Sequence, residues 1–558
     1  MSLEKVNEKS ILDSVSNTRK GHEFGSEVDL FSFHEQRAGR LIIDPAEAKI
    51  ELGEEVASKL KLSSDGTKVL WPQPTDSDLD PQNWSDRRKN TLLLIVTLAA
   101  IVPDFDSGIG IACIFALAKQ YDTTPGVINN LTQNWSIFLI GWGGIFAVML
   151  VRRLGRLPVL FWSQVLALGF CVGCTFAPNL KTFAAMRCLN GFFATAPQAT
   201  GLYCVTDLYP FHLQARKLNI WTMGFLVSPF LAAFAFGMLV SRTSWRWSYG
   251  IGSIYSAIVV LLIILFMEET MYDRTVKPIP VPTTTGLRRR FEDLVGITGL
   301  KMQKFRVSWH DSVMSPFRIV WRPHLLMALI FEAMLFGFSI GINVTNVVFL
   351  GTPLPFGYGF DQLAIGASYA TPIVGVLLGE VAGRYANDFI MNVSIRRNNG
   401  VFEAESRLWA CYIAIPLYIC GFVTLGVSLE KHLSVGALIM GWGIAEFAVM
   451  INTVAIYAYC NDAFPKHQVA TLLLQDKVIE LTELQGEISA LINIARTLGG
   501  FSVAYFQVPW ALKHGAIQTL GCEAAIVAGL FLLFVPLLQW KGSALRVSAI
   551  APNYIFTF

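Results

Sequence analysis

Charged side chains interrupt several of the long apolar stretches of this 558-residue sequence. A charge at the depth of a lipid bilayer costs about 3 kcal/mol on insertion scales, so such side chains usually face a polar cavity on a path for ions or protons. Five of them are candidates for carrying protons or contacting a polar ligand: Asp104, Asp106, Arg187, Glu332 and Glu446. Two more, Arg496 and Glu523, could do the same or could simply pair with each other.

The composition indicates that the elements holding these residues lie in a membrane. Hydrophobic residues make up 53% of the chain and charged residues only 15%, against about 25% charged residues in soluble domains. One soluble core could not bury so much apolar surface, so we expect an integral membrane protein. The net charge of +3 gives no indication of nucleic-acid binding. All nine cysteines fall in or beside apolar stretches, which favours buried thiols over a disulfide framework.

Apolar runs of about the ~20 residues that a helix needs to cross a bilayer follow one another along the chain. They form two sets, separated by a polar stretch. The first set lies at 91–117, 129–150, 158–177, 182–204, 219–240 and 245–267. The second set lies at 323–350, 362–382, 407–429, 435–460, 486–509 and 516–539. The sequence therefore predicts an all-α membrane protein with six spans in each half.

Loop charges orient the predicted spans. With the N-terminus inside, the inner loops carry roughly twenty Lys and Arg residues against about six in the outer loops, so both termini are predicted to be cytosolic. The resulting division is a largely disordered cytosolic N-terminal tail, an N-terminal lobe, a central cytosolic loop, a C-terminal lobe and a cytosolic C-terminal tail. Their bounds are 1–88, 89–267, 268–322, 323–540 and 541–558.

The two halves share a local pattern. DLYPFH at 207–212 follows the fourth span, and DAFPKH at 462–467 follows the tenth. The same order of Asp, aromatic, Pro and His at the same place in each half favours a six-span repeat. Two repeated halves with a binding site between them are typical of transporters.

Several short sequence motifs resemble those of one known family. DPQNWS at 80–85 precedes the first span, WRW at 245–247 opens the sixth, and ETMYD at 269–273 closes it. With the stretch from RRNNG to ESRL at 396–408, these words resemble the fungal drug:proton antiporter branch of the major facilitator superfamily. The resemblance covers about residues 70–545 and implies the twelve-helix, two-lobed fold of that superfamily.

The superfamily's signature between spans 2 and 3 is partly present. Arg153, Gly155 and Arg156 match it, but Arg152 stands where an Asp is expected. In the family that Asp helps to latch the cytosolic face, so the latch of this half is in question, whereas the second half keeps an acid, Asp388, near the corresponding loop. Plain basic anchors at the membrane surface are the alternative reading of these arginines.

The antiporter motif of span 5 is also partly present. In the family it ends in Gly-Pro, and here it runs from Gly224 to Ser228 and Pro229. The proline that kinks the helix is kept, while Ser228 weakens the pattern of small residues. The resemblance therefore favours antiport.

The resemblance suggests a proton-coupling group. Spans 1 and 4 line the first-half cavity in this family, so Asp104 or Asp106 could meet Arg187, which matches a motif arginine that takes part in coupling. Residues two apart on a helix face nearly opposite ways, so we expect one aspartate to face the cavity unless Pro103 unwinds the turn. An arginine that moves relative to a carboxylate changes how readily that carboxylate holds a proton. A static buried ion pair is the alternative.

Glu332 and Glu446 lie in spans that line the second half of the cavity in this family, where acids suit a cationic or polar substrate or proton carriage. We therefore predict a proton-coupled transporter that exports xenobiotics, as in multidrug resistance, or secondary metabolites across a fungal plasma membrane by alternating access. Proton-coupled uptake of a cationic nutrient such as a polyamine stays open, as does a non-transporting membrane sensor.

The sequence gives no sign of catalytic chemistry. GFSIG at 337–341 fits the G-x-S-x-G pattern but lies inside an apolar helix, and no G-x-x-x-x-G-K-[ST] phosphate loop occurs. We expect no enzyme activity, no cofactor and no metal. The expected partners are a small-molecule substrate, protons and the lipid bilayer, with no nucleic acid and a monomeric state. Residues 469–485 interrupt the family pattern and are predicted to be an insertion or a gene-model error.

Overall fold

The computed structural model describes residues 45–63, 65–272, 286–303, 306–353, 357–397, 404–463 and 485–548. The chain divides into two compact units, Met1–Gln73 and Pro74–Phe558. In the described part, the regular elements are helices, and the β pairing is one isolated bridge between Leu62 and Val69. The predicted insertion, up to residue 484, and the end of the chain from residue 549 lie outside the described residues.

The first unit contains local structure where we expected a disordered tail. Its described residues form α3 (Pro45–Leu52) and α4 (Glu54–Ser58), followed by the Leu62–Val69 bridge. These two helices lie within the stretch 1–88 that the sequence predicts to be a largely disordered tail.

The lead into the first span is folded around one carboxylate. Asp80 is fully buried, accepts hydrogen bonds from the backbone and hydroxyl of Thr75 and caps η1 (Pro81–Asn83) through the backbone N–H of Gln82. Lys89 at the start of the first span donates to the Gln82 carbonyl. In the DPQNWS motif, Asp80 thus caps the short helix η1, and the Lys89 bond joins that helix to the first span.

The first half of the second unit forms six spans. Most of them are single long helices, but span 4 consists of two helices because Pro197, near the start of the second helix, lacks the N–H that would continue the first. The elements are α5 (Asp86–Ala112), α6 (Ile114–Gln120), α7 (Pro125–Ile128), η2 (Asn129–Asn134), α8 (Trp135–Leu154), α9 (Arg156–Phe176), α10 (Leu180–Ala194), α11 (Ala196–Leu208), α12 (Phe211–Val240) and α13 (Trp245–Phe266).

The second half forms six further spans. Three short helices precede it in the segment predicted to be a polar loop: α14 (Gly286–Val295), α15 (Ile297–Lys301) and α16 (Trp309–Val320). The spans are α17 (Pro323–Gly351), α18 (Gln362–Ser368) with α19 (Ala370–Arg397), η4 (Ala404–Leu408) with α20 (Trp409–Lys431), α21 (Val435–Ala463), α22 (Gln485–His514) and α23 (Ala516–Ser548).

The predicted architecture of twelve membrane helices agrees with these elements. Ten described helices are long and apolar enough to cross a bilayer by themselves. The two that complete the bundle are span 4, which is divided into α10 and α11, and α22, a 30-residue helix that carries charged side chains. Several helices extend beyond the predicted apolar runs, and α19 continues to Arg397 rather than ending near residue 382.

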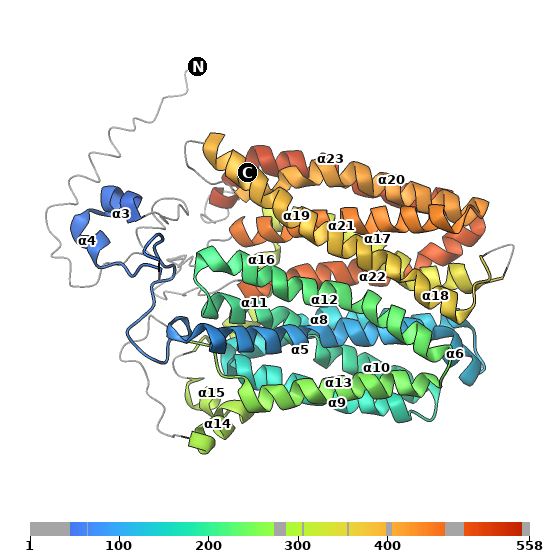
Figure 1. Ribbon diagram of the computed structural model, residues 1–558, viewed down its shortest axis with the longest axis horizontal. Helices are drawn as coiled ribbons and strands as arrows, with labels where there is room; N and C mark the ends of the chain where they lie inside the picture. Colours follow the sequence, from blue (N-terminus) through green and yellow to red (C-terminus); the bar gives the residue numbers. More distant parts are fainter. Residues whose placement is uncertain are drawn as a thin grey trace. The chain divides into compact units, whose positions relative to one another are not determined.

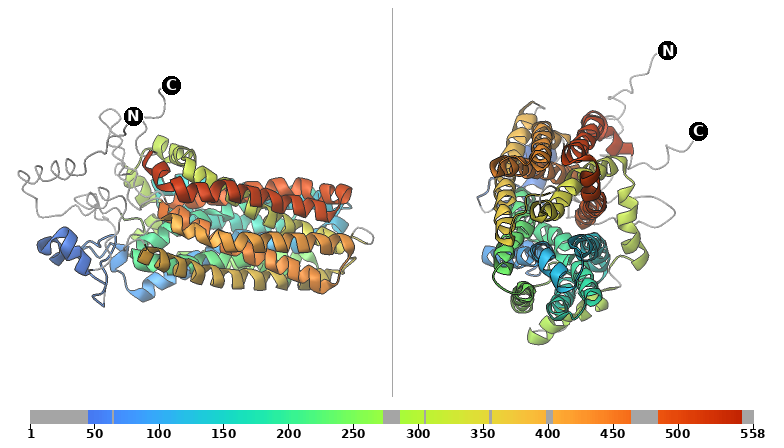
Figure 2. Two further views of the ribbon diagram at one scale, coloured as in Figure 1. Left: turned by 90° about the horizontal axis from the view of Figure 1, so that it is seen from above. Right: turned by 90° about the vertical axis from the view of Figure 1, so that its right-hand side faces the viewer.

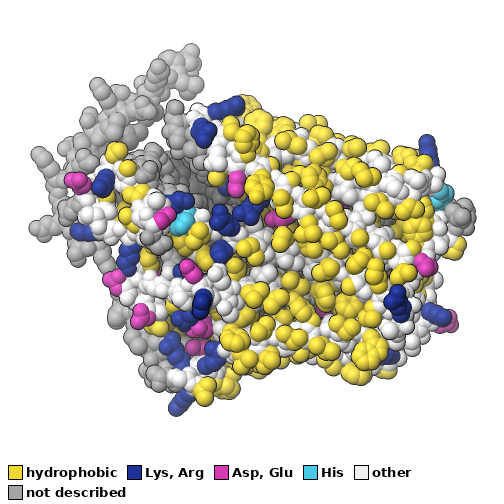
Figure 3. Space-filling model, viewed as in Figure 1, with side chains coloured by type: hydrophobic (Ala, Val, Ile, Leu, Met, Phe, Trp, Pro, Cys, Tyr) yellow, Lys and Arg dark blue, Asp and Glu magenta, His cyan; other side chains and the backbone are white. Residues whose placement is uncertain are grey.

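Helices α5–α13 lie together as a first lobe, and α17–α23 as a second lobe beside it (Figures 1 and 2). Helix α22 of the second lobe packs against α8 and α11, and α12 of the first lobe packs against α18 and α19. Apolar side chains cover the flanks of the spans, whereas many charges gather at the end that carries α14–α16 (Figure 3). We call that end the central-loop end.

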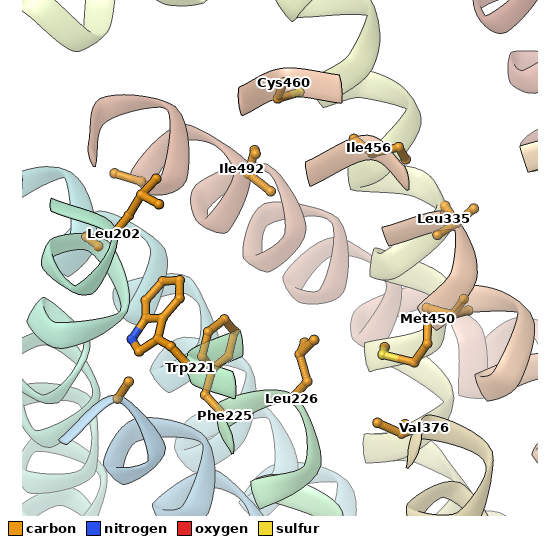
Figure 4. Packing of buried hydrophobic residues seen from close by; sticks show 14 of the residues in the cluster. Leu202, Trp221, Phe225, Leu226, Leu335, Val376, Met450, Ile456, Cys460 and Ile492 are labelled. Carbon is orange, nitrogen blue, oxygen red and sulfur yellow. The ribbon is translucent and has the colours of Figure 1, made fainter. Parts of the chain in front are cut away.

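Buried apolar residues of both lobes form one continuous cluster. Figure 4 shows Leu202 and Trp221 of the first lobe and Ile492, Leu335 and Met450 of the second, all from this cluster. Because the same core extends across both lobes, any relative movement of the lobes must slide or separate packed surfaces.

The backbones of α17 and α22 approach each other closely in the second lobe. A Cβ atom on Gly499 would lie 2.0 Å from the carbonyl oxygen of Ala333, and one on Gly337 would lie 2.7 Å from the backbone of Gly499. Small residues let membrane helices approach closely where lipid offers no hydrophobic driving force for association. The G-x-S-x-G stretch at 337–341 is therefore a helix-packing surface.

We expect Gly499→Ala to lower the thermal unfolding midpoint of the purified protein, because overpacking a helix contact costs about 1–3 kcal/mol. Gly529→Ala on α23 is the matched control, since a Cβ atom there meets nothing within 4 Å. Size-exclusion of heated samples gives both midpoints. Equal midpoints for the two variants would contradict the close crossing.

Candidate functional site

Asp106 lies inside the first lobe and is connected to Arg187 through a third residue. Its Oδ2 accepts a hydrogen bond from Nδ2 of Asn190 at 3.0 Å, and Oδ1 of Asn190 accepts one from Nη1 of Arg187 at 2.7 Å. All three side chains are buried, and Gly252 of α13 leaves room for the carboxylate. Nε and Nη2 of Arg187 have no hydrogen-bond partner in the structure. Asp106 and Arg187 therefore belong to one network with spare hydrogen-bonding capacity, without direct ion-pair contact.

Asp104 faces the other way, toward the boundary between the lobes. Its Oδ2 accepts a hydrogen bond of 2.6 Å from Nε2 of Gln198 on α11. Oε1 of Gln198 in turn faces Nδ2 of Asn493 on α22 at 3.5 Å, and Thr195 lies within hydrogen-bond distance of both amides. The opposite facing expected from a spacing of two residues is present, with Pro103 inside an unbroken helix.

Glu332 and Arg496 form the charged centre of the second lobe. Oε1 of Glu332 lies 3.9 Å from Nε of Arg496 and accepts a hydrogen bond of 3.1 Å from Thr453. The guanidinium lies over the ring of Phe336 at 3.4 Å, and Nη1 is 3.5 Å from the hydroxyl of Tyr457. These contacts hold the cation mainly through an aromatic face and a long ion pair.

One of our two predictions was that Arg496 and Glu523 pair with each other. The structure contradicts it. Glu523 instead accepts two hydrogen bonds from Nε2 of Gln507 on the neighbouring helix. Arg496 pairs with Glu332 of its own lobe and lies one turn after Asn493, whose Nδ2 faces the Gln198 amide that bonds to Asp104. Arg496 is therefore the partner of Glu332 close to the cross-lobe polar contact, a position that sequence reasoning did not assign to it.

Glu446 lies in a separate polar group of the second lobe. Both of its carboxylate oxygens are 3.0 Å from the hydroxyl of Ser339, which donates to them. Trp442 lies one turn away and donates from Nε1 to the side-chain oxygen of Asn343. Glu446 is buried and bonded to Ser339. Of the two predicted acids of this lobe, Glu332 is therefore the one that pairs with Arg496.

The first-lobe signature residues join the loops to the spans. Arg156 forms a buried bidentate ion pair with Asp207, at 2.8 and 3.0 Å. Gly155 has a φ of 109°, a left-handed conformation that favours glycine, and it lets α9 begin with its first two backbone N–H groups bonded to Glu269. Asp207, the first residue of the D-x-aromatic-P motif after span 4, is thus the partner of the signature residue Arg156.

Arg153 of the signature and Asp388, its expected counterpart in the second half, have different surroundings. Nη1 of Arg153 donates to the backbone carbonyls of Gln303 and Val307, which fixes the central loop against span 2. Asp388, the expected counterpart in the second half, is exposed within α19, nine residues before the helix ends at Arg397. The first-half signature therefore anchors the loop, whereas the structure gives Asp388 of the second half an exposed position.

Arg152 has an acid partner in the other lobe. Its Nη1 lies 2.8 Å from Oε1 of Glu487 at the start of α22. The same carboxylate accepts hydrogen bonds from the hydroxyl of Tyr203 on α11 at 2.5 Å and from that of Ser315 on α16 at 3.1 Å. Glu487 is fully buried. A basic residue in place of the family's Asp thus meets an acid across the lobes, and this contact joins both lobes and the central loop.

Glu487 was missed at the sequence level, although its surroundings carried a signal. It belongs to the word GEISAL at 486–491, directly after the predicted insertion. An acid at the first turn of a long helix is also favourable to the helix dipole. The lobes are in contact at the other end too, where Gln362 of α18 donates to the carbonyl of Ala112 on α5 at 2.9 Å.

The kink motif of span 5 packs against span 1. A Cβ atom on Gly224 would meet the methyl group of Thr97 at 2.8 Å, and one on Gly108 would lie 2.2 Å from the carbonyl oxygen of Pro229. That carbonyl lies at the proline inside α12, and the hydroxyl of Ser228 donates to the Phe225 carbonyl. Ser228 thus satisfies a carbonyl near the proline, where the ring disturbs the helix ladder.

Among the described residues, no group of three or more His, Cys, Asp or Glu side chains could hold a metal ion. An apolar crevice of about 390 Å³ lies between the far ends of α17 and α22, lined by Val348, Phe349, Thr352, Val508 and Leu512. Val348 is ~24 Å along α17 from Glu332 at 1.5 Å per residue. The crevice is therefore separate from the charged centre.

Twelve spans in two lobes, with charged groups buried along the boundary between the lobes, define a membrane transporter. Residues 96–504 match the family described as "Major Facilitator Superfamily". The chain belongs to the Major Facilitator Superfamily, as its short sequence words predicted.

Relatives and solved structures agree with this assignment. The chain is 22% identical over 407 residues to "Efflux pump radE" of Floropilus chiversii, covering 72% of this chain and 74% of that protein. It is 23% identical over 483 residues to the "Trichosetin biosynthesis cluster MFS transporter" of Gibberella fujikuroi, covering 83% and 93%. The fold resembles the xylose transporter XylE of E. coli with a TM-score of 0.56 and 13% identity, covering 81% and 98%.

The Arg152–Glu487 pair yields a prediction about opening at the central-loop end. Removing one partner of a buried ion pair costs about 3–5 kcal/mol, so Arg152→Gln should weaken closure there. A cysteine in place of Ser489, which is buried between the lobes, reports opening through its rate of alkylation. We expect faster alkylation in Arg152→Gln than in the parent.

Arg88→Gln is the control, because it removes the same charge at the same end from an exposed pair within the first lobe. The exchange Arg152→Glu with Glu487→Arg should restore slow alkylation in part. Equal rates in Arg152→Gln, the control and the parent would show that the pair does not hold the lobes together.

Proposed function

We propose that this chain is a proton-coupled transporter that exports small organic molecules by alternating access. The observation that carries the proposal is the polar chain across the boundary between the lobes. Asp104 and Gln198 supply its first-lobe side, and Arg496 with Glu332 supplies its second-lobe side. A group that moves when the lobes move is suited to linking substrate binding to proton exchange.

Proton coupling follows from competition for shared partners. A carboxylate deprived of its cation or hydrogen-bond donor binds a proton more readily. Movement of α22 relative to α5 changes the distance from Arg496 to Asp104, because the two residues belong to different lobes. Within the first lobe, Asn190 connects Asp106 to Arg187, so a rearrangement of α10 would change the environment of that carboxylate. Glu446 is a further proton acceptor in this proposal.

Export of xenobiotics or secondary metabolites is supported by the names of relatives, one called an efflux pump and one a biosynthesis cluster transporter. The kink of α12 at Pro229, packed against Gly108 of α5, supports antiport. We place the protein in the fungal plasma membrane as a monomer, with the central-loop end in the cytosol. The excess of loop Lys and Arg at that end supports this orientation.

Uptake of a small cation such as a polyamine is the second candidate. Arg496 pairs with Glu332, whereas Asp104 at the boundary is bonded to the neutral Gln198, which leaves an acid there without an ion-pair partner of its own. A cationic substrate could serve as the counter-ion of that carboxylate. The direction of proton-driven flux separates this candidate from export.

The coupling groups are tested by Asp104→Asn, Asp106→Asn and Arg187→Ala in proteoliposomes with an imposed pH gradient. We expect at least one of the aspartate variants, and Arg187→Ala, to lower gradient-driven transport by on the order of 100-fold while substrate binding remains, because a proton-transfer group is lost. A protonophore should abolish transport by the parent, and ATP removal with the gradient clamped should not.

Glu523→Gln is the control acid, since Glu523 is buried against Gln507 in the second lobe and is assigned no coupling role. Its gradient-driven transport should remain within about twofold of the parent's. Full-rate transport by the parent in uncoupled liposomes would contradict proton coupling and leave facilitated diffusion. Normal transport by all three variants would move the coupling group to Glu332 or Glu446.

A further inference from the structure

Helix α16 lies outside the bundle, and one of its faces packs on the spans. Ser312, Ser315 and Ile319 are buried on that face. The hydroxyl of Ser312 donates to the carbonyl of Met149 on α8, and Ser315 donates to Glu487 on α22. The helix therefore bridges one span of each lobe at the central-loop end.

A second face of α16 carries a row of exposed apolar side chains, with the exposed His310 among them at the start of the helix. Trp309, Val313 and Phe317 follow one another at four-residue spacing, and Trp321 continues the row directly after the helix. Phe317 is 44% exposed and Trp321 is 75% exposed. Soluble proteins rarely expose a row of large apolar side chains without a partner.

The third face carries charge. Asp311 and Arg318 lie about two turns apart on it and pair at 3.3 Å between Oδ1 and Nη1. Successive residues of a helix are turned by about 100°, so Asp311 and Arg318 lie on the side of α16 opposite Trp309, next to the last residues of the apolar row. Apolar, charged and protein-facing sides thus divide the helix into three sectors, the pattern of a helix that lies in the plane of a membrane interface.

The apolar row continues the lipid-facing surface of the spans. Phe146 of α8 is exposed and lies one turn from Met149, to which α16 is bonded. At its other end α16 leads through Arg322 directly into α17. In the end-on view of Figure 2 the spans are seen down their axes, whereas the yellow-green α16 is seen from the side at the edge of the bundle. The row is therefore placed where the bilayer surface meets the bundle.

We propose that α16 is an interfacial helix whose exposed apolar row, Trp309, Val313, Phe317 and Trp321, inserts into the bilayer leaflet at the central-loop end. The partner of this surface is the lipid itself. Asp311 and Arg318 mark the edge that stays in water. Because Ser315 on the opposite face bonds to Glu487, the depth of the helix in the leaflet also acts on the contact that closes the lobes. The inference is independent of the substrate and of proton coupling.

Insertion is tested on the full-length protein in nanodiscs, with an environment-sensitive fluorophore on a single introduced cysteine. Phe317→Cys and Arg318→Cys are a matched pair, because they are neighbours in sequence on different faces of one helix. Val313→Cys repeats the test one turn away. Signal from unsubstituted protein labelled in the same way corrects for its own cysteines.

We expect brominated lipid to quench the label at 313 and 317 more than aqueous iodide does, and the order to reverse at 318. Stronger quenching by iodide at all three positions would overturn the proposal. Protection from both quenchers at 313 and 317 would also overturn it and would indicate a protein partner or a second copy of the chain.

The link to closure has its own readout. Phe317→Ser removes apolar contact with lipid and should speed alkylation of the Ser489→Cys reporter in nanodiscs, whereas Arg318→Ser should leave the rate unchanged. In detergent without a bilayer, the difference between the two variants should vanish. An equal rate for both variants in nanodiscs would show that the inserted helix does not act on closure.

Discussion

The constraint on which the structure depends is that a charge buried among membrane helices is costly without a partner, and several of these charges find theirs on another helix. Arg152 meets Glu487, Arg156 meets Asp207, and Glu332 meets Arg496. Each contact joins two elements that are distant in the sequence, so the charges determine which helices pack together. Leaving one such partner unpaired costs about 3–5 kcal/mol, a large share of a protein's net stability.

The same contacts that hold the bundle together are placed where movement would break them. Arg152–Glu487 joins the lobes at the central-loop end, and Gln362–Ala112 joins them at the other end. Arg496 lies between them, paired with Glu332 and one turn from Asn493, which faces Gln198 of the first lobe. In the proposed mechanism, one end can open only when its contact separates, and the central acids then exchange partners or protons.

The sequence was sufficient to predict the number and order of the spans, because runs of about 20 apolar residues are a local property. It also predicted that Asp104 and Asp106 face opposite ways, since helix geometry alone decides that. It could not show that Arg496 faces Glu332 rather than Glu523, because the choice depends on how α17, α22 and α23 are rotated about their axes. The exchange of an expected Asp for Arg152 became interpretable only when packing placed Glu487 beside it.

Paired spin labels on the α12 span and its flank and on the α18–α19 span test alternating access most directly, because the two spans belong to different lobes and pack against each other. One pair replaces Arg216 and Asp388 at the central-loop end, and the other replaces Thr243 and Leu363 at the opposite end; all four side chains are exposed. We expect pulsed electron–electron distances in lipid to change in opposite directions when pH or substrate is varied, one pair lengthening as the other shortens. Distances that lengthen together, or that stay fixed at both ends while transport proceeds, would contradict alternating access.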